Sequence, residues 1–212
     1  MIKRIEDLRI VGISGSLREH SYAYAALEHA MALLTRAGCQ VRILDLRKIP
    51  LPFCNGDNRE LWPAYPGVAE VRGAVSRAHA LVLATPEYHG GMSGVLKNAL
   101  DLLDVEHLEG KVVGAISVLG GPANSNALND VGRIMRWCHA WVIPQQIAIG
   151  RARTAFVNGQ IVDEDLRRRF ERLADSLIWS ATRLGNLDTD VSGTSSSAFV
   201  GRTDIQAQPA AG

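Results

Sequence analysis

The spacing of hydrophobic residues predicts alternating buried strands and amphipathic helices along the chain. Leu8 to Ser14 is a short apolar, β-branched run that ends in glycine and serine, which is typical of a strand buried on both faces. Tyr22 to Ala37 carries apolar residues at helical spacing and stops at Gly38, and Val41 to Leu46 is a second apolar run. This part of the chain therefore predicts a strand, a helix and a strand.

The same alternation continues through the rest of a domain predicted to span residues 1–185. The pattern predicts helices over 67–77, 94–103, 127–139 and 163–184, and strands over 79–85, 111–119 and 141–149, the last interrupted by Pro144. Residues 48–66 contain four prolines and no clear periodicity, which predicts an irregular surface loop. Five strands and five helices in alternation predict an α/β fold, a flavodoxin-like, doubly wound parallel sheet of order 2-1-3-4-5 with helices on both faces.

Residues 186–212 form a Ser/Ala/Gly/Pro-rich tail that cannot bury enough apolar surface to fold alone. We expect this tail to be mobile or packed on a neighbouring subunit.

The composition narrows the class of partner. The 212 residues include 23 basic and 22 acidic ones of mixed sign, a net charge of +1, which excludes an electrostatic footprint for nucleic acid or anionic lipid. No apolar run approaches the roughly 20 residues of a membrane helix. The three dispersed cysteines are interpreted as small apolar side chains, and their odd number is consistent with a reducing compartment. The sequence predicts a cytoplasmic protein whose partners are small molecules or copies of itself, and no metal site.

The turn after the first strand is suited to an anion. Ser16 and Ser21 offer hydroxyls, Arg18 offers a guanidinium, and the following helix presents free N–H donors. A phosphate monoester fits this set, although Ser21 could equally only cap the helix and Ser16 only turn the chain. Neither G-x-G-x-x-G nor a P-loop motif is present, so a mononucleotide is favoured over a dinucleotide or a nucleoside triphosphate at this turn.

The turn after the third strand carries the more specific motif. Its sequence, PEYHGGMSGVLKNALD over residues 86–101, contains glycines that let backbone approach a flat ligand closely. Together with GSLREHS over residues 15–21, it resembles the family of NAD(P)H-dependent FMN reductases, which includes flavin, quinone, azo-dye and chromate reductases. The resemblance runs from about Leu8 to Leu184 and leaves only the tail outside.

The resemblance implies that the phosphate of FMN lies at the first turn and the isoalloxazine at the third. The residues implied in FMN binding are Ser16, Arg18, Ser21 and Ala23 for the phosphate, Pro86, Glu87, Tyr88, His89 and Gly90 for the ring, and Ser117, Gly120 and Gly121 for its pyrimidine end. Two positions depart from the family: Ala23 and His89 stand where many relatives have asparagine. The first removes a side-chain amide near the phosphate, and the second is interpreted as a turn residue that contributes only its backbone N–H.

The resemblance also implies an enzyme that passes a hydride from NADPH or NADH through bound FMN to an acceptor such as free flavin, a quinone or an azo compound, in ping-pong fashion. No catalytic side chain is required beyond the flavin itself. A homodimer or homotetramer is implied, with a flavin-dependent monooxygenase as one possible recipient of reduced flavin. Among the large side chains, Trp137 and Trp141 are predicted to pack in the core with Met135, with a subunit contact as the alternative.

Two other functions remain open at this level. A flavodoxin-like electron carrier or flavin-binding protein would not oxidise nicotinamide itself, although such carriers are typically acidic. A hydrolase would use His89-Gly90-Gly91 as an oxyanion loop, although no G-x-S-x-G nucleophile motif is present at the first turn.

Overall fold

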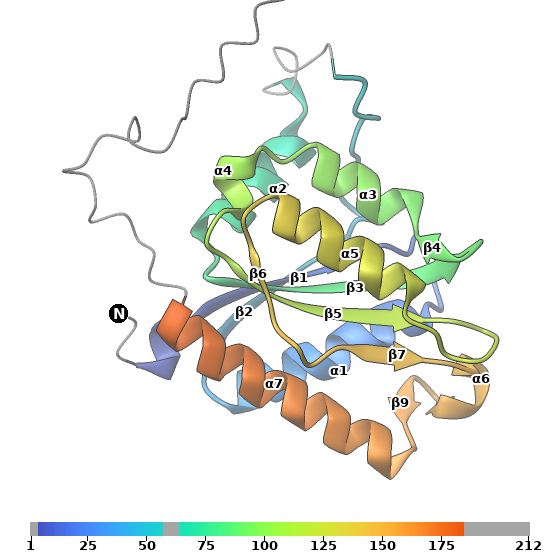
Figure 1. Ribbon diagram of the computed structural model, residues 1–212. Coiled ribbons are helices and arrows are strands. Elements are labelled where there is room, and N and C mark those ends of the chain that lie inside the picture. The colour runs from blue at the N-terminus through green and yellow to red at the C-terminus, as the bar shows by residue number, and fades with distance from the viewer. Residues whose placement is uncertain (1–3, 57–63, 185–212) are drawn as a thin grey trace, which may run out of the picture.

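The computed structural model describes residues 4–56 and 64–184, which form a twisted parallel sheet between two layers of helices (Figure 1). The main strands are β1 (Arg9–Ser14), β2 (Gln40–Leu44), β3 (Ala80–Tyr88), β5 (Val112–Val118), β6 (Trp141–Val142) and β7 (Ile147–Ile149). Their order is β2-β1-β3-β5-β6, all parallel, and β7 pairs with the far end of β5. Since β6 and β7 are the two halves of the strand predicted to break at Pro144, the predicted order is confirmed.

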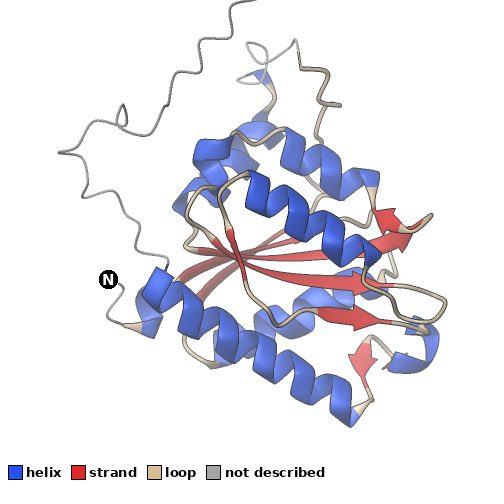
Figure 2. Cartoon of the chain, viewed as in Figure 1, coloured by secondary structure: helices blue, strands red, loops and turns tan. Residues whose placement is uncertain are grey.

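The helices divide between the two faces of the sheet, as Figure 2 shows. One face is covered by α1 (Tyr22–Arg36) and α7 (Glu164–Leu184), and the other by α2 (Pro66–Arg77), α3 (Gly94–Asp101), α4 (Val105–Leu108) and α5 (Asn126–Trp137). The predicted layered α/β fold is therefore confirmed.

Strand residues alternate between the two apolar layers. In β1, Ile10 packs with the cluster under α1 and α7, while Val11 and Ile13 pack with the cluster under α2, α3 and α5. Because neighbouring side chains of a strand point to opposite faces, a strand buried on both sides needs the continuous apolar run seen in the sequence. Each fully buried Leu or Ile contributes about 1.5–3 kcal/mol relative to exposure.

Several short elements did not emerge from the hydrophobic pattern. They are a 3-10 turn at Ile5–Asp7, β4 (Gly91–Met92), α4, α6 (Ala152–Ala155), β8 (Phe156–Val157) and β9 (Gln160–Ile161). Two to four residues are too few to show a period of 2 or 3.6. The predicted 186–212 tail lies outside the described residues, as does part of the predicted Pro-rich loop.

The prediction that the tryptophans pack in the core is wrong. Trp137 is 82% exposed and Trp141 is 49% exposed, whereas Met135 is fully buried as expected. Trp137 is the last residue of α5, and Trp141 begins β6 at the edge of the sheet, so neither is covered by a second layer.

The cysteines agree with the interpretation as small apolar side chains. All three are free thiols, and Cys39 lies in the apolar layer beneath α1. Burial raises the pKa of the Cys39 thiol to about 11, which keeps it protonated and unreactive near neutral pH.

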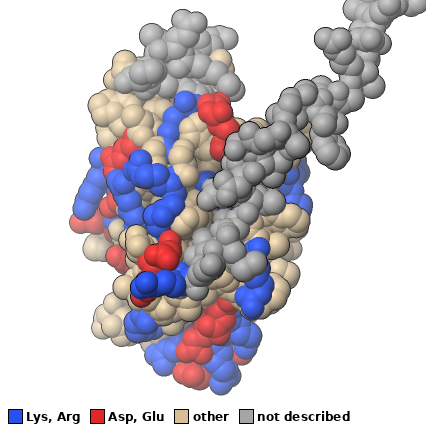
Figure 3. Space-filling view, turned by 90° about the vertical axis from the view of Figure 1, so that its left-hand side faces the viewer, with Lys and Arg blue, Asp and Glu red and all other residues tan. Residues whose placement is uncertain are grey.

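One face of the molecule carries charged side chains of both signs. Figure 3 shows Lys and Arg side chains interspersed with Asp and Glu side chains over the face in view. Among residues 4–56 and 64–184, no helix combines the length and apolar character needed to cross a membrane.

Candidate functional site

A cavity of about 390 Å³ opens at the carboxyl edge of the sheet, where the first, third and fourth strand-to-helix connections meet. This cavity, called the edge pocket below, lies where open parallel sheets bind ligands. It is lined by Ser16, Arg18, His20, Ser21, Tyr22, Ala23, Pro86, Glu87, Tyr88, Val118, Leu119, Gly120, Ala152 and Arg153.

The end of the edge pocket where the sequence predicts a phosphate lies at the start of α1. Ser21 is the N-cap, and its hydroxyl accepts a hydrogen bond from the backbone N–H of Tyr24 at 3.1 Å. The first backbone bond within the helix runs from Ala25 to the Ser21 carbonyl, so the N–H groups of Tyr22 and Ala23, which both line the pocket, have no helical acceptor. The helix therefore presents two N–H donors and its positive dipole end to the pocket.

Arg18 adds a full positive charge at the same end. Its backbone N–H donates to the Ser16 hydroxyl at 3.4 Å, while its exposed guanidinium has no ion pair within the described part of the chain. The predicted capping role of Ser21 and the predicted anion site are thus compatible, because the cap satisfies a deeper N–H and leaves the first two free.

Directly before this turn, the Ser14 hydroxyl also lacks a hydrogen-bond partner from residues 4–56 and 64–184. Its hydroxyl at the carboxyl end of β1 is buried and is the one buried side-chain polar atom without a partner among the described residues. Buried hydroxyls normally find a partner, so the orphan points to a group or water that belongs near this turn.

The first and third turns are tied together through Ser93, the N-cap of α3. Its hydroxyl donates to the Gly15 carbonyl at 2.6 Å and accepts from Leu96 N–H at 3.2 Å, and its own N–H donates to the Thr85 hydroxyl at 3.0 Å. A Cβ at Gly15 would lie 2.4 Å from the Ser93 hydroxyl oxygen, so only glycine allows this approach. The two motifs singled out in the sequence are therefore held together by one buried serine.

The third turn is a β-hairpin. β3 runs on through Pro86, Glu87 and Tyr88, and then returns antiparallel in β4, with Tyr88 paired to Gly91. His89 and Gly90 form the two-residue loop, with φ of 52° and 75°, the left-handed geometry of a type I′ turn. The edge pocket is walled as far as Tyr88, while His89 and Gly90 lie beyond that wall in the exposed turn.

Glu87 joins the third turn to the fourth. The residue is 6% exposed, and its carboxylate accepts hydrogen bonds from the Asn124 side-chain amide at 2.6 Å and from the Ala127 N–H, near the start of α5, at 3.4 Å. A carboxylate at a helix start is stabilised by the helix dipole. The Glu87 side chain thus fixes the third turn relative to the fourth, because both of these hydrogen bonds reach across to the fourth turn and the start of α5.

At the fourth turn, the structure separates the three predicted residues. Gly120 lines the edge pocket; Ser117 is buried within β5; and the Gly121 carbonyl accepts the N–H of Arg151 at 2.7 Å. Their predicted contact with the pyrimidine end of FMN stays a prediction.

Sequence reasoning missed one wall of the edge pocket. Ala152 and Arg153 come from α6, and the Ala152 N–H donates to the Leu119 carbonyl at 3.2 Å. The other lining residues it missed are His20, Tyr22, Val118 and Leu119. These four residues adjoin the recognised turns, whereas no sequence signal marks α6. It reaches the pocket because β7 pairs with the carboxyl end of β5, and α6 begins directly after β7.

Comparison with known proteins places the chain among flavin-dependent reductases. The family described as NADPH-dependent FMN reductase matches residues 8–154. A similar curated protein is the NADPH-dependent FMN reductase ArsH of Shigella flexneri, with 31% identity over 150 residues, covering 68% of this chain and 57% of that protein. The FMN-dependent NADPH-azoreductase of Staphylococcus haemolyticus is 32% identical over 138 residues, covering 64% of this chain and 73% of that protein.

The chain thus spans only a little over half the length of the Shigella relative. Solved structures with a similar fold include the apo form of the NADH:FMN oxidoreductase EMOB, with a TM-score of 0.67, 23% identity, and coverage of 87% of this chain and 99% of that one. FerB of Paracoccus denitrificans, a flavoenzyme NAD(P)H:(acceptor) oxidoreductase, gives a TM-score of 0.70 at 18% identity, covering 84% and 98%. At these identities the likeness concerns the fold.

Proposed function

Because the chain belongs to the family of NADPH-dependent FMN reductases, which matches residues 8–154, we propose that it binds FMN in the edge pocket and oxidises NADPH or NADH. The electrons pass to a small-molecule acceptor. The observation that carries this proposal is the meeting of three turns around one cavity, with the start of α1 and the Arg18 guanidinium at one end.

The residues of the edge pocket fit a phosphate at that end. A terminal phosphate carries about two negative charges and needs several donors. The free N–H groups of Tyr22 and Ala23, the hydroxyls of Ser16 and Ser21, and the Arg18 guanidinium supply them. Ala23 has no side-chain amide, but its backbone N–H can donate a hydrogen bond to the phosphate.

The opposite end fits a flat ring with polar edges. Pro86 and Tyr88 on one side and Val118 to Gly120 on another provide apolar surface and backbone groups held by strand pairing. The chemistry that FMN supplies when bound is hydride acceptance and onward electron transfer. The polypeptide positions the ring: Glu87 locks the third and fourth turns together, and Ser93 locks the third to the first.

The acceptor and the assembly belong to the same proposal. Free flavin, quinones and azo compounds are the acceptors we expect, and the azoreductase relative supports the last of these. A flavin-dependent monooxygenase is a further proposed recipient. We also propose a homodimer or homotetramer and a cytoplasmic location, the first of which light scattering of the purified chain tests directly.

The function is tested with purified protein loaded with FMN. We expect FMN-dependent oxidation of NADPH or NADH, with parallel lines in double-reciprocal plots when nucleotide and quinone concentrations are varied, as a ping-pong exchange requires. Rapid mixing with NADPH separates this enzyme from a flavodoxin-like carrier, because a carrier would keep its bound flavin oxidised. The proposal would be refuted if neither NADPH nor NADH bleached the bound flavin.

A further inference from the structure

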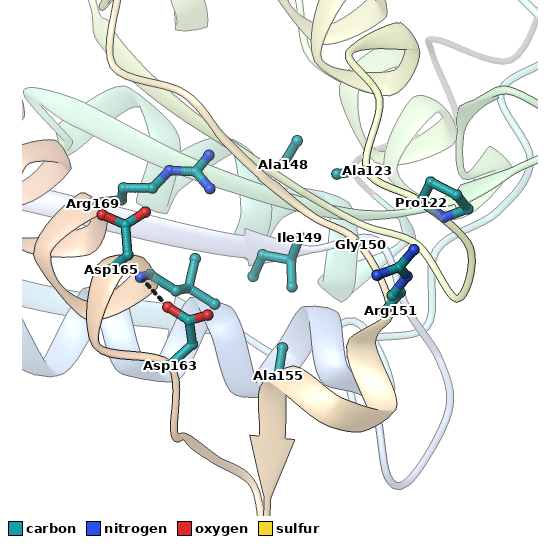
Figure 4. A pocket seen from close by; sticks show the side chains of 11 residues that line it. Pro122, Ala123, Ala148, Ile149, Gly150, Arg151, Ala155, Asp163, Asp165 and Arg169 are labelled. Atoms are coloured by element: carbon teal, nitrogen blue, oxygen red, sulfur yellow. Dashed lines mark hydrogen bonds between the residues drawn. The ribbon is translucent and has the colours of Figure 1, made fainter.

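A second cavity, called the side pocket below, lies next to the edge pocket between the end of β7 and the start of α7. Its volume is about 320 Å³, within the range of small-molecule sites. Figure 4 shows its composition: apolar side chains such as Ile149 and Ala155 lie in the middle, while Arg151 and Arg169 lie at opposite ends. The cavity therefore has apolar side chains at its centre, Arg151 at one end, and Arg169 with the carboxylates of Asp163 and Asp165 at the other.

The two pockets share two segments of chain. Gly120 lines the edge pocket and Pro122 the side pocket, while Arg153 lines the edge pocket and Arg151 the side pocket. Two residues of chain span at most about 7 Å, so at both places the pockets adjoin. The segments also touch, because a Cβ at Gly150 would lie 2.2 Å from the backbone nitrogen of Ala123. One elongated molecule could therefore occupy both pockets.

The two arginines and the two aspartates of the side pocket differ in the hydrogen bonds and ion pairs that they make. Within the described residues, neither the Arg151 nor the Arg169 guanidinium takes part in an ion pair or a side-chain hydrogen bond. Asp163, by contrast, caps α7 by accepting the Leu166 N–H at 2.8 Å, and Asp165 lies 3.7 Å from Arg168. The groups left with unused hydrogen-bonding capacity are the two arginines.

We propose that the side pocket binds the adenosine half of NADPH, with Arg151 at the pyrophosphate and Arg169 at the 2′-phosphate. This rests on the proposed function, in which the nicotinamide enters the edge pocket. The adenosine half of NADPH carries a phosphate at the 2′ position and the pyrophosphate at the 5′ position of its ribose, with a flat aromatic base attached to the same ring. Two separated arginines with apolar side chains between them suit these two anionic groups and the face of the base. Arg151 is assigned the pyrophosphate because its segment adjoins the edge pocket.

The assignment makes Arg169 the residue that distinguishes NADPH from NADH, since only NADPH carries the 2′-phosphate. The neighbouring Asp163 and Asp165 carboxylates repel a lone anion, so inorganic phosphate should bind this pocket poorly. Affinity then requires the base and the phosphates together, which suits a nucleotide rather than a free ion.

The test uses the full chain loaded with FMN and two probes, 2′,5′-ADP and 5′-AMP, in calorimetric titrations. Loss of a charged hydrogen bond weakens binding by about tenfold or more. We expect this loss for 2′,5′-ADP in Arg169→Ala and in the milder Arg169→Gln, with 5′-AMP binding unchanged as a sign of an intact pocket. Arg151→Ala should weaken both probes. Arg172→Ala, which removes an exposed α7 arginine outside the pocket, is the matched control.

Steady-state kinetics gives the second readout. In Arg169→Ala the KM for NADPH should rise about tenfold or more while the KM for NADH stays constant. Equal 2′,5′-ADP affinity in wild type and Arg169→Ala would overturn the assignment, even if the protein oxidises NADPH. Conversely, 2′,5′-ADP binding that depends on Arg169 in a protein without nucleotide oxidation would support the site and refute the proposed function.

Discussion

At the scale of single residues, the edge pocket depends on groups whose hydrogen-bonding capacity the fold leaves open. Arg18 is the clearest of these, because its guanidinium lines the pocket beside the start of α1 and makes no ion pair within the described residues. An arginine in this position is suited to an anion, since its charge adds to the helix dipole.

Replacing Arg18 with alanine should weaken FMN binding by about 1.5–3 kcal/mol, the range for a hydrogen bond to a charged group. Equilibrium dialysis of FMN against wild type, Arg18→Ala and the surface control Arg172→Ala measures the difference. Because Arg18 is exposed, unfolding midpoints should stay the same. Unchanged FMN affinity in Arg18→Ala would move the phosphate away from the first turn.

Gly15 is the residue whose lack of a side chain matters most to the same turn. In Gly15→Ala the new Cβ would lie 2.4 Å from the Ser93 hydroxyl oxygen and 2.6 Å from the Leu96 Cβ. We expect about 1–3 kcal/mol of destabilisation, as for overpacked sites, with weaker FMN binding. Gly94→Ala is the control, because a Cβ there meets nothing within 4 Å. Equal urea unfolding curves for both variants would contradict the close approach.

At the scale of elements, the β3–β4 hairpin sets the position of the wall from Pro86 to Tyr88. Its two-residue loop has both residues at positive φ, which matches the right-handed twist of the strands. His89 therefore acts through backbone geometry, in agreement with its interpretation as a turn residue.

This geometry predicts opposite results for two substitutions of His89. His89→Asn should keep stability and FMN affinity, because asparagine tolerates the left-handed region. His89→Val should destabilise the protein by about 1–2 kcal/mol, since a β-branched residue is strained at φ of 52°. Thermal unfolding with and without FMN measures both. A loss of FMN affinity in His89→Asn without loss of stability would instead assign the imidazole a direct role.

At the scale of the whole molecule, the packing of α1 on α7 links stability to pH through His29. The ring contacts Phe170 edge-on at 4.9 Å, and burial, followed by Arg36 and Arg167, lowers its pKa from the ordinary value of 6.5, with Glu171 opposing. The unfolded chain therefore takes up this proton first as the pH falls below 6.5. Stability is complete above 6.5 and decreases as the pH falls toward the lowered folded pKa.

We expect the unfolding free energy of wild type to decrease between pH 7 and pH 5.5 more than that of His29→Gln, which cannot titrate. Urea unfolding followed by circular dichroism measures both at each pH. Asp45 acts in a separate window: the hydrogen bond from Arg47 lowers its pKa below 3.8, so its contribution is lost only at more acidic pH. Parallel pH profiles of wild type and His29→Gln would contradict the assignment to His29.

The sequence by itself determined the layered fold and the two motifs of the site. Continuous apolar strands and amphipathic helices encode their own burial, and the broken strand at Pro144 appeared as two strands, β6 and β7. Ser16, Arg18 and Ser21 could be placed in one turn because they are close in sequence, and that turn lines the edge pocket. Whether they bind FMN stays a prediction.

The tertiary structure alone decided what depends on contacts between distant segments. Arg153 and the side pocket were not predictable, because α6 is four residues long and reaches the site only through the path of the chain after β7. Burial of Trp137 was predicted wrongly, because the hydrophobicity of a residue at the end of a helix does not reveal whether another element packs over it. Local periodicity specifies elements and their buried faces, whereas pocket walls arise from the packing of loops that have no period.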